Sequence, residues 1–244
     1  MRIFRFAVLL AALGAPFAGA QAPEPAQAPQ APKVRPPWEL EWAYLSKYRD
    51  ADAQLGPPAR GEKRVVFLGD SITEGWGAAD GKFFAGRPYV NRGIGGQTTS
   101  QMLVRFRQDV IDLKPSAVVI LGGTNDIAQN GGVTTLEAIE QNLQSMAELA
   151  RVNHIRVVLS SVLPVYDYPW RRGLEPADKI FELNRWIAAY CSTNNLVYLD
   201  YYSPMVDARR GLRAEYSIDG VHPNGAGFAV MEPLVEKALL RALR

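Results

Sequence analysis

The chain has 244 residues, 48% of them hydrophobic, and a formal net charge of +2. That length and apolar content can build one sizeable core, and the nearly balanced charge, with no basic stripe, argues against nucleic acid as a partner. The single cysteine, Cys191, leaves no disulfide framework and no thiolate metal site, and its apolar surroundings predict a buried, unreactive thiol.

Residues 1–20 have the pattern of a secretory signal peptide. Two arginines precede a short apolar run, and residues 18–20 (Ala-Gly-Ala) resemble a cleavage site. The run is too short and too interrupted for a membrane span, and an uncleaved amino-terminal anchor is the alternative. We therefore predict an exported protein, periplasmic or secreted, with no stable membrane insertion after signal cleavage.

Residues 21–37 consist almost entirely of Ala, Pro and Gln. Such a composition cannot bury enough apolar surface to fold, so we predict an extended linker stiffened by proline. The pattern then changes, because four large apolar side chains recur at helical spacing: Trp38, Trp42, Leu45 and Tyr48. This spacing predicts an aromatic helix face that packs on the domain, in preference to one that lines a sugar site.

Short apolar runs alternate with helical patterns through the rest of the chain. The runs predict five strands, at 65–68, 89–91, 117–121, 155–160 and 196–200. Helices are predicted at 99–113, 135–152, 176–193 and 226–243. This alternation is typical of a parallel sheet with helices on both faces. We predict one α/β domain over residues 38–244, a three-layer α/β/α sandwich around a doubly wound, five-stranded parallel sheet.

The chemically distinctive residues follow the carboxyl ends of these strands, which crossover connections bring to one edge of the sheet. Ser71 follows the first strand, where it is either a nucleophile or the N-cap of the next helix. His222 stands directly before Pro223, which favours an extended loop, and Asp219 lies three residues earlier. A carboxylate placed there can orient the imidazole while the other ring nitrogen accepts the serine proton.

Three hydrogen-bond donors at the same edge are suited to a developing oxyanion. A backbone N–H serves only where no side chain obstructs it, which suits Gly96, and Ser71 offers its own N–H. The carboxamide of Asn125 is the third donor. The competing interpretation of residues 93–96 is a phosphate-binding turn, but they lack the Gly-x-Gly-x-x-Gly spacing, and no Gly-Lys-Ser/Thr motif occurs.

Together these blocks resemble the SGNH (GDSL-type) hydrolase family. The four matching blocks occur in the family's order: residues 69–71 (Gly-Asp-Ser), Gly96, residues 123–126 (Gly-Thr-Asn-Asp) and residues 219–222 (Asp-Gly-Val-His). The resemblance covers roughly residues 64–243 and is strongest to the branch with platelet-activating-factor acetylhydrolase-type and bacterial carbohydrate acetylesterase-type members. It implies a flavodoxin-like sheet.

The resemblance implies Ser71 as the nucleophile, His222 as general base and then acid, and Asp219 as the residue that orients His222. It also implies an oxyanion hole made of the Ser71 N–H, the Gly96 N–H and the Asn125 side chain.

Two aspartates of the same blocks, Asp70 and Asp126, are expected to brace the loops. The sequence departs from the family pattern at Ile72, where the family label has leucine, and at Gln97, where many relatives have aspartate. Neither departure touches the acyl chemistry, but with Gln97 in place of aspartate the family pattern does not predict the hydrogen-bond donors beside Gly96.

Substrate choice is expected to depend on residues 164–173, an irregular segment after the fourth strand at the same edge. Long irregular loops in compact domains are usually functional or disordered. Its Tyr168 and Trp170 could stack on a sugar ring and Arg171 could meet an anionic group; the equal alternative is a surface loop whose aromatics cover a neighbouring helix. Trp76 is a further candidate for a flat sugar-binding face.

We therefore predict an exported serine esterase that hydrolyses short-chain esters, O-acetyl groups on carbohydrates above all, by a Ser-His-Asp acyl-enzyme mechanism. A small-molecule or glycan ester is the expected substrate, and no cofactor and no metal are expected. The alternatives are a lysophospholipase or thioesterase of the same family, which needs a long apolar groove, and a non-catalytic carbohydrate-binding module.

Overall fold

The computed structural model describes residues 41–80 and 82–244. The predicted signal peptide (1–20), the predicted linker (21–37) and Trp38 lie outside these residues, so those predictions stay predictions.

Five parallel strands form the sheet of the described chain, in the order β2-β1-β3-β4-β5. They are β1 (Val65–Gly69), β2 (Tyr89–Gly93), β3 (Ala117–Leu121), β4 (Arg156–Ser160) and β5 (Val197–Leu199). The first strand, β1, lies inside the sheet. β2 is added on one side of it, and β3, β4 and β5 follow in turn on the other side. This is the flavodoxin-like doubly wound order, which confirms the predicted fold class.

The predicted helices correspond to the four longest helices of the structure. These are α4 (Thr99–Asp109), α6 (Leu136–Val152), α7 (Ala177–Thr193) and α9 (Gly225–Ala242). Thr135 caps α6, because its side chain accepts a hydrogen bond from the Ala138 N–H at 3.2 Å. The shorter elements are α2 (Arg49–Leu55), α3 (Ser71–Asp80), η1 (Ile111–Leu113), α5 (Thr124–Ile127), α8 (Tyr202–Met205) and η2 (Ala214–Tyr216).

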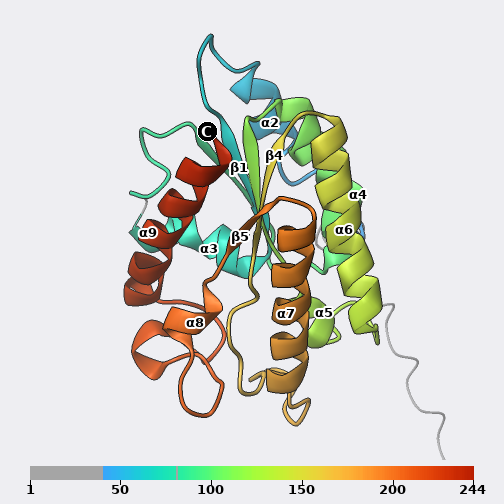
Figure 1. The fold of residues 1–244 in the computed structure, drawn as a ribbon, viewed down its shortest axis with the longest axis vertical. Coiled ribbons are helices and arrows are strands. Elements are labelled where there is room, and N and C mark those ends of the chain that lie inside the picture. The colour runs from blue at the N-terminus through green and yellow to red at the C-terminus, as the bar shows by residue number, and fades with distance from the viewer. Residues whose placement is uncertain (1–40, 81) are drawn as a thin grey trace, which may run out of the picture. The chain divides into compact units, whose positions relative to one another are not determined.

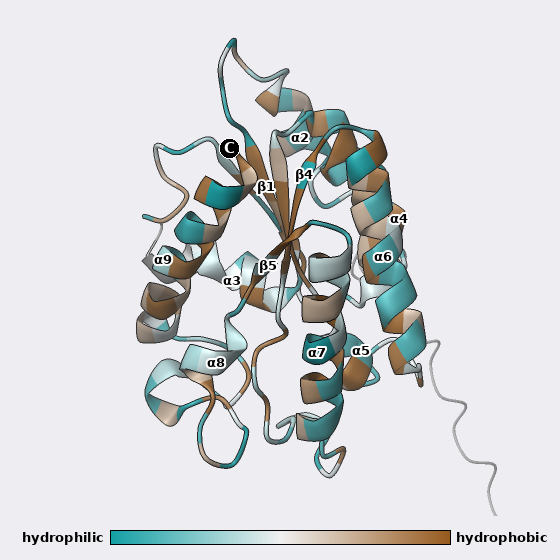
Figure 2. Cartoon of the chain, viewed as in Figure 1, coloured by the Kyte–Doolittle hydropathy of each residue, from teal (hydrophilic) through white to brown (hydrophobic). Residues whose placement is uncertain are grey.

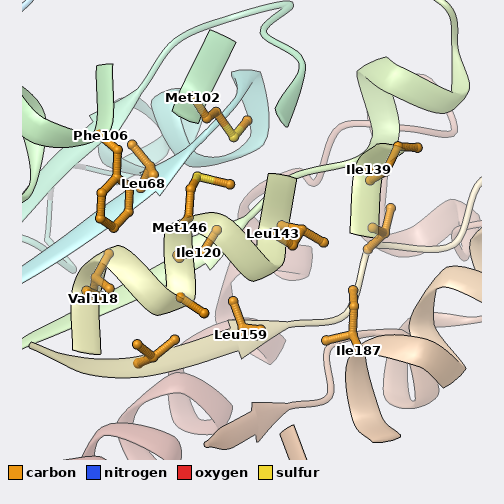
Figure 3. Packing of buried hydrophobic residues seen from close by; sticks show 14 of the residues in the cluster. Leu68, Met102, Phe106, Val118, Ile120, Ile139, Leu143, Met146, Leu159 and Ile187 are labelled. Carbon is orange, nitrogen blue, oxygen red and sulfur yellow. The ribbon is translucent and has the colours of Figure 1, made fainter. Parts of the chain in front are cut away.

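The helices form two layers around the sheet (Figure 1): α3 and α9 lie on one side, and α4, α6 and α7 on the other. Alternate residues of each strand point to opposite faces. Val66 and Leu68 of β1 therefore join the core under α4, α6 and α7, whereas Val65 and Phe67 join the core under α3 and α9. Figure 3 shows the first of these cores, where Leu68 lies near Met102 and Phe106.

The hydropathy of the chain follows these layers (Figure 2). The central strands β1 and β3 are apolar and buried along their length, because both of their faces are covered, while the helices combine an apolar inner face with hydrophilic residues outside. Cys191 of α7 is buried, and burial raises the pKa of its thiol to about 12, so the predicted buried thiol is confirmed. None of the helices in the described ranges is long and apolar enough to cross a membrane.

Residues 41–48 do not form the predicted helix. They make a series of turns, and α2 begins only at Arg49. The backbone carbonyls of Trp42, Ala43 and Leu45 accept hydrogen bonds from glutamine side chains at or near α4 instead of helical N–H groups. Tertiary hydrogen bonds have thus overridden the local spacing, and Trp42 is 59% exposed rather than packed on the domain.

Candidate active site

The loops after β1, β2 and β3 leave neighbouring strands at the same level of the sheet. Gly69 of β1 pairs in register with Gly93 of β2 and with Leu121 of β3. The predicted site residues follow shortly after these positions: Ser71, Gly96 and Asn125. Because the three strands are adjacent, residues far apart in the sequence lie at one edge of the sheet, as predicted.

Ser71 is the first residue of α3, and Asp70 is the residue that caps this helix. The Asp70 Oδ1 atom accepts a hydrogen bond from the Ile72 N–H at 2.9 Å, which leaves the Ser71 hydroxyl for other partners. Gly93 allows the first turn of α3 to lie against the end of β2, since a Cβ there would be only 2.1 Å from the Glu74 backbone nitrogen. This close approach sets the position of Ser71.

A continuous chain of hydrogen bonds connects Ser71, His222 and Asp219. The Ser71 Oγ atom lies 2.9 Å from His222 Nε2, and His222 Nδ1 lies 2.8 Å from Asp219 Oδ2. His222 sits in the loop before α9, as the following proline predicted. In this geometry the neutral imidazole with its proton on Nδ1 can accept the serine proton at Nε2.

The Asp219 side chain also organises its own loop. Its Oδ1 atom accepts hydrogen bonds from the N–H groups of Val221 at 3.0 Å and of His222 at 2.8 Å. Partial burial raises the pKa of this carboxyl, but the hydrogen bonds from the backbone and ring of His222 outweigh it and hold the pKa below its usual value. Asp219 is therefore ionised over the neutral pH range and can stabilise an imidazolium on His222.

The three predicted oxyanion donors lie in the segments that follow β1, β2 and β3. Gly96 adopts φ +76°, a conformation that favours glycine, and within the described chain its N–H has no hydrogen-bond acceptor. The Ser71 N–H belongs to the first turn of α3, where backbone N–H groups have no partner within the helix. The buried Asn125 carboxamide donates one hydrogen to the Gln97 carbonyl at 3.1 Å, which leaves its second hydrogen available.

Asp126 braces two loops of the site, as the sequence suggested. Its carboxylate accepts hydrogen bonds from the Thr99 N–H at 2.9 Å and the Thr99 hydroxyl at 2.7 Å, which ties the loop after β3 to the start of α4. Burial raises the pKa of Asp126, although the hydrogen bonds from Thr99 oppose this.

Arg105 is a structural residue of the site that sequence reasoning missed. Its side chain is fully buried and donates hydrogen bonds to the backbone carbonyls of Gly69 and Arg92, at 2.9 and 2.8 Å. It also forms an ion pair with Asp109 at 2.8 Å. One guanidinium thus joins the ends of β1 and β2 directly below the loops of Ser71 and Gly96. An arginine within an apolar helix face was the only signal for it in the sequence.

Two of the predicted substrate-binding residues are in the core, and these predictions are wrong. Trp76 is 2% exposed and stacks on Phe83 and Phe228, with ring centroids 4.7 and 5.5 Å apart. Tyr168 is fully buried, and its hydroxyl donates to the Thr124 carbonyl at 2.9 Å. Neither ring has a face available to a sugar, because helix packing and the loop fold have covered both.

Trp170 and Arg171 are exposed at the site, and Trp170 connects it to Asn130, which the sequence did not single out. The Trp170 ring lies 6.0 Å from the His222 ring, and its Nε1 donates to Asn130 Oδ1 at 3.1 Å. Asn130 Nδ2 in turn donates to Asn125 Oδ1 at 2.6 Å, which orients the carboxamide of the predicted oxyanion hole. Arg171 donates to the Gln129 carbonyl at 2.9 Å, so its guanidinium fastens the segment 164–173 beside α5.

The described residues contain no group of three or more His, Cys, Asp or Glu side chains placed to hold a metal ion. His154, the second histidine, lies at the other end of the sheet beside the start of β4, where it lines an arginine-rich surface cavity.

Comparison with known proteins gives consistent matches. The model of the GDSL-like Lipase/Acylhydrolase family matches residues 67–230. The crystal structure of a GDSL-like lipase from Bacteroides thetaiotaomicron is 46% identical, with a TM-score of 0.81 over 83% of this chain and 100% of that one. Esterase TesA of Pseudomonas aeruginosa is 27% identical over 67% of this chain and 77% of its own length. The uncharacterized lipoprotein YqeF of Bacillus subtilis is 31% identical over 46% of this chain, and the match spans about half of YqeF (53%).

Proposed function

Because the chain belongs to the GDSL-like lipase/acylhydrolase family, and is thus an ester hydrolase, we propose that it removes short acyl groups, above all O-acetyl groups on carbohydrates, through an acyl-enzyme formed on Ser71. The family match confirms the predicted resemblance and enzyme class. The observation that best supports the proposed mechanism is the continuous chain of hydrogen bonds from Ser71 through His222 to Asp219.

In the first half of the reaction, Ser71 Oγ attacks the ester carbonyl while His222 Nε2 takes its proton. The carbonyl oxygen becomes an oxyanion, which the N–H groups of Ser71, Gly96 and Asn125 stabilise by hydrogen bonds that strengthen as charge develops. His222 then returns the proton to the leaving alkoxide, and the alcohol departs. The acyl group remains on Ser71 as an ester.

In the second half, water replaces the alcohol. His222 takes a proton from the water as it attacks the acyl carbonyl, and the same donors hold the second oxyanion. Collapse of this intermediate breaks the bond to Ser71 Oγ, which regains a proton from His222. The products are a carboxylic acid and free enzyme, and Asp219 stays ionised throughout as the partner of the imidazolium.

The surroundings of Ser71 favour a short acyl group and a hydroxyl-rich alcohol. A long acyl chain gains only about 0.8 kcal/mol for each buried CH₂, so it needs a continuous apolar groove. The cavity beside the Gly96 turn is lined by Trp42, Tyr44 and Ile94 but is interrupted by the polar side chains of Lys47, Glu74 and Gln97, so it is not a continuous apolar groove. Trp170 is 45% exposed beside the His222 ring and offers a flat face for a sugar.

Export, to the periplasm or beyond the cell, is part of the same proposal. It rests on the signal-peptide pattern of residues 1–20 and fits an extracytoplasmic glycan ester better than a cytosolic thioester. One of the matched relatives is a lipoprotein.

Two substitutions test the mechanism. Ser71→Ala and His222→Ala should each lower kcat by at least ~10³-fold, and the double variant should be little worse, because the two side chains act as a unit. A fluorophosphonate should label Ser71 alone, as mass spectrometry of the digested protein would show. Labelling of another serine, or full activity of Ser71→Ala, contradicts the mechanism.

A chain-length series tests the substrate class. With p-nitrophenyl esters, kcat/KM should be highest for acetate and fall through butyrate to octanoate. Trp170→Ala should weaken acetate release from an acetylated glycan more than turnover of p-nitrophenyl acetate, because loss of the Nε1 bond to Asn130 affects both substrates whereas loss of the sugar-stacking face affects the glycan in addition. A best substrate with octanoyl or longer chains would replace this proposal with a lysophospholipase or thioesterase.

A further inference from the structure

A cavity of about 390 Å³ lies beside the turn that presents the Gly96 N–H. Its walls come from residues 41–48, from Glu74 of α3 and from the Gly95–Gly96 turn itself. Ser71 is close to this turn, since a Cβ on Gly95 would lie 3.8 Å from the Ser71 Cβ. The cavity therefore opens next to the proposed nucleophile, on the side of the oxyanion hole.

The outer wall of the cavity, residues 41–48, is fixed by hydrogen bonds to its backbone. Gln101 Nε2 donates to the Trp42 carbonyl at 2.6 Å, and Gln108 Nε2 donates to the Leu45 carbonyl at 2.8 Å. At the end of the segment, the Tyr48 hydroxyl donates to the Gly93 carbonyl at the end of β2. These bonds hold the backbone of residues 41–48 in place relative to the site, even where a side chain such as Trp42 does not pack on the domain.

Gln97 explains how this wall is joined to the site. It is buried, its Nε2 donates to the Ala43 carbonyl at 2.8 Å, and its Oε1 accepts from Arg105 Nε at 2.5 Å. An aspartate in its place could accept from the arginine but could not donate to Ala43. Gln97, which departs from the family pattern, thus binds a segment that precedes the family match. That match begins at residue 67.

The lining of the cavity combines aromatic and other apolar surface with polar groups, and its two charged side chains are paired. Trp42 is 59% exposed, so an indole face is available at the wall. The two charged side chains of the lining, Lys47 and Glu74, form an ion pair at 2.9 Å, and the second Glu74 oxygen accepts from the Gly95 N–H at 2.7 Å. An anionic headgroup would find the lysine already paired, and a long acyl tail would meet Lys47, Glu74 and Gln97 as well as the apolar surface of Trp42, Tyr44 and Ile94. An uncharged sugar ring fits both features, because its C–H face can stack on the indole while its hydroxyls bond to the polar rim.

We propose that this cavity is a subsite for a second sugar residue of an oligosaccharide or polysaccharide ester, with Trp42 as its stacking platform. The proposal rests on the proposed function and deepens it. Trp170 lies beside His222, and Trp42 lines the cavity beside the Gly95–Gly96 turn, next to Ser71. A glycan that spans both would place an acetylated ring between them, so the substrate has more than one sugar.

The first experiment compares substrates of different length. Trp42→Ala should lower kcat/KM about five- to tenfold for chemically acetylated xylotetraose, mainly through KM, because one aromatic stacking contact is lost. It should leave p-nitrophenyl acetate and acetylated methyl xyloside nearly unchanged, and Trp42→Phe should restore most of the loss. Phe181→Ala, which removes an exposed aromatic ring of α7 that does not line the cavity, is the matched control.

The second experiment separates this proposal from the proposed function. Calorimetric titration of Ser71→Ala protein with unacetylated xylotetraose and cellotetraose measures binding without turnover, and adding Trp42→Ala should weaken it about five- to tenfold. Equal binding or equal kcat/KM with and without Trp42 overturns the subsite. A Trp42→Ala change that instead alters the preference between butyrate and octanoate makes the cavity an acyl pocket and also overturns it. Trp42-dependent binding in a protein that cleaves no acetyl ester upholds the subsite and overturns the proposed function.

Discussion

Asp70 should make the stability of this protein fall as the pH rises from about 4 to about 7. Its side chain is 1% exposed; Oδ1 accepts the bond from the Ile72 N–H, whereas Oδ2 has no hydrogen-bond partner in the described chain. Burial raises the pKa of this carboxyl from 3.8 to about 7, against the opposing effects of the Ile72 N–H and of His222.

The sign and size of the effect follow from proton linkage. The folded protein holds the Asp70 proton up to about pH 7, whereas the unfolded chain releases it near pH 3.8. Between these values the folded state binds more protons, so the Asp70 contribution to stability is lost as the pH rises through this window. A difference of about 3 pKa units, at about 1.36 kcal/mol each, gives a loss of about 4 kcal/mol over the whole window.

Urea unfolding of the wild type and Asp70→Asn at pH 5, 6, 7 and 8 measures this contribution. Asparagine keeps the acceptor for the Ile72 N–H and never ionises, so its advantage over the wild type should grow by about 2–3 kcal/mol between pH 5 and pH 8. Asp112→Asn, at a carboxylate that is 61% exposed, controls for the loss of one charge. A free-energy difference between wild type and Asp70→Asn that does not change with pH refutes the reasoning.

Three further outcomes are expected. Asn125→Ala should lower kcat by ~10²–10³-fold with a smaller effect on KM, because an oxyanion contact strengthens only in the transition state; a KM effect alone in steady-state kinetics would make Asn125 a substrate-binding residue. Arg105→Met should lower the free energy of unfolding in urea by about 3–5 kcal/mol, because it leaves Asp109 buried without its partner; an unchanged urea midpoint would contradict this. EDTA should leave ester hydrolysis unchanged, and loss of activity restored by a divalent ion would contradict the serine mechanism.

Asn130 and Trp76 are two residues whose roles the sequence did not predict. The predicted nucleophile, base, orienting acid and oxyanion donors lie at one edge of the sheet because each follows a strand, and the strand pattern was legible from apolar runs and glycines. Asn130 carries no such signal, since its importance comes only from the two side chains that it joins, Trp170 and Asn125. Trp76 has the chemistry of a sugar platform, but the packing of α3 on the sheet decided that its ring is core.

The sequence by itself determined the order of strands and helices, the doubly wound sheet and the residues at its carboxyl edge, because these depend on local periodicity and on the chirality of crossover connections. Tertiary structure alone decided the path of residues 41–48 and the exposure of Trp42. Local spacing favoured a helix there, but backbone carbonyls hydrogen-bonded to Gln97, Gln101 and Gln108 made turns the more stable choice. Those glutamines are distant in the sequence, so the pattern of residues 41–48 does not reveal the hydrogen bonds that outweigh helix propensity.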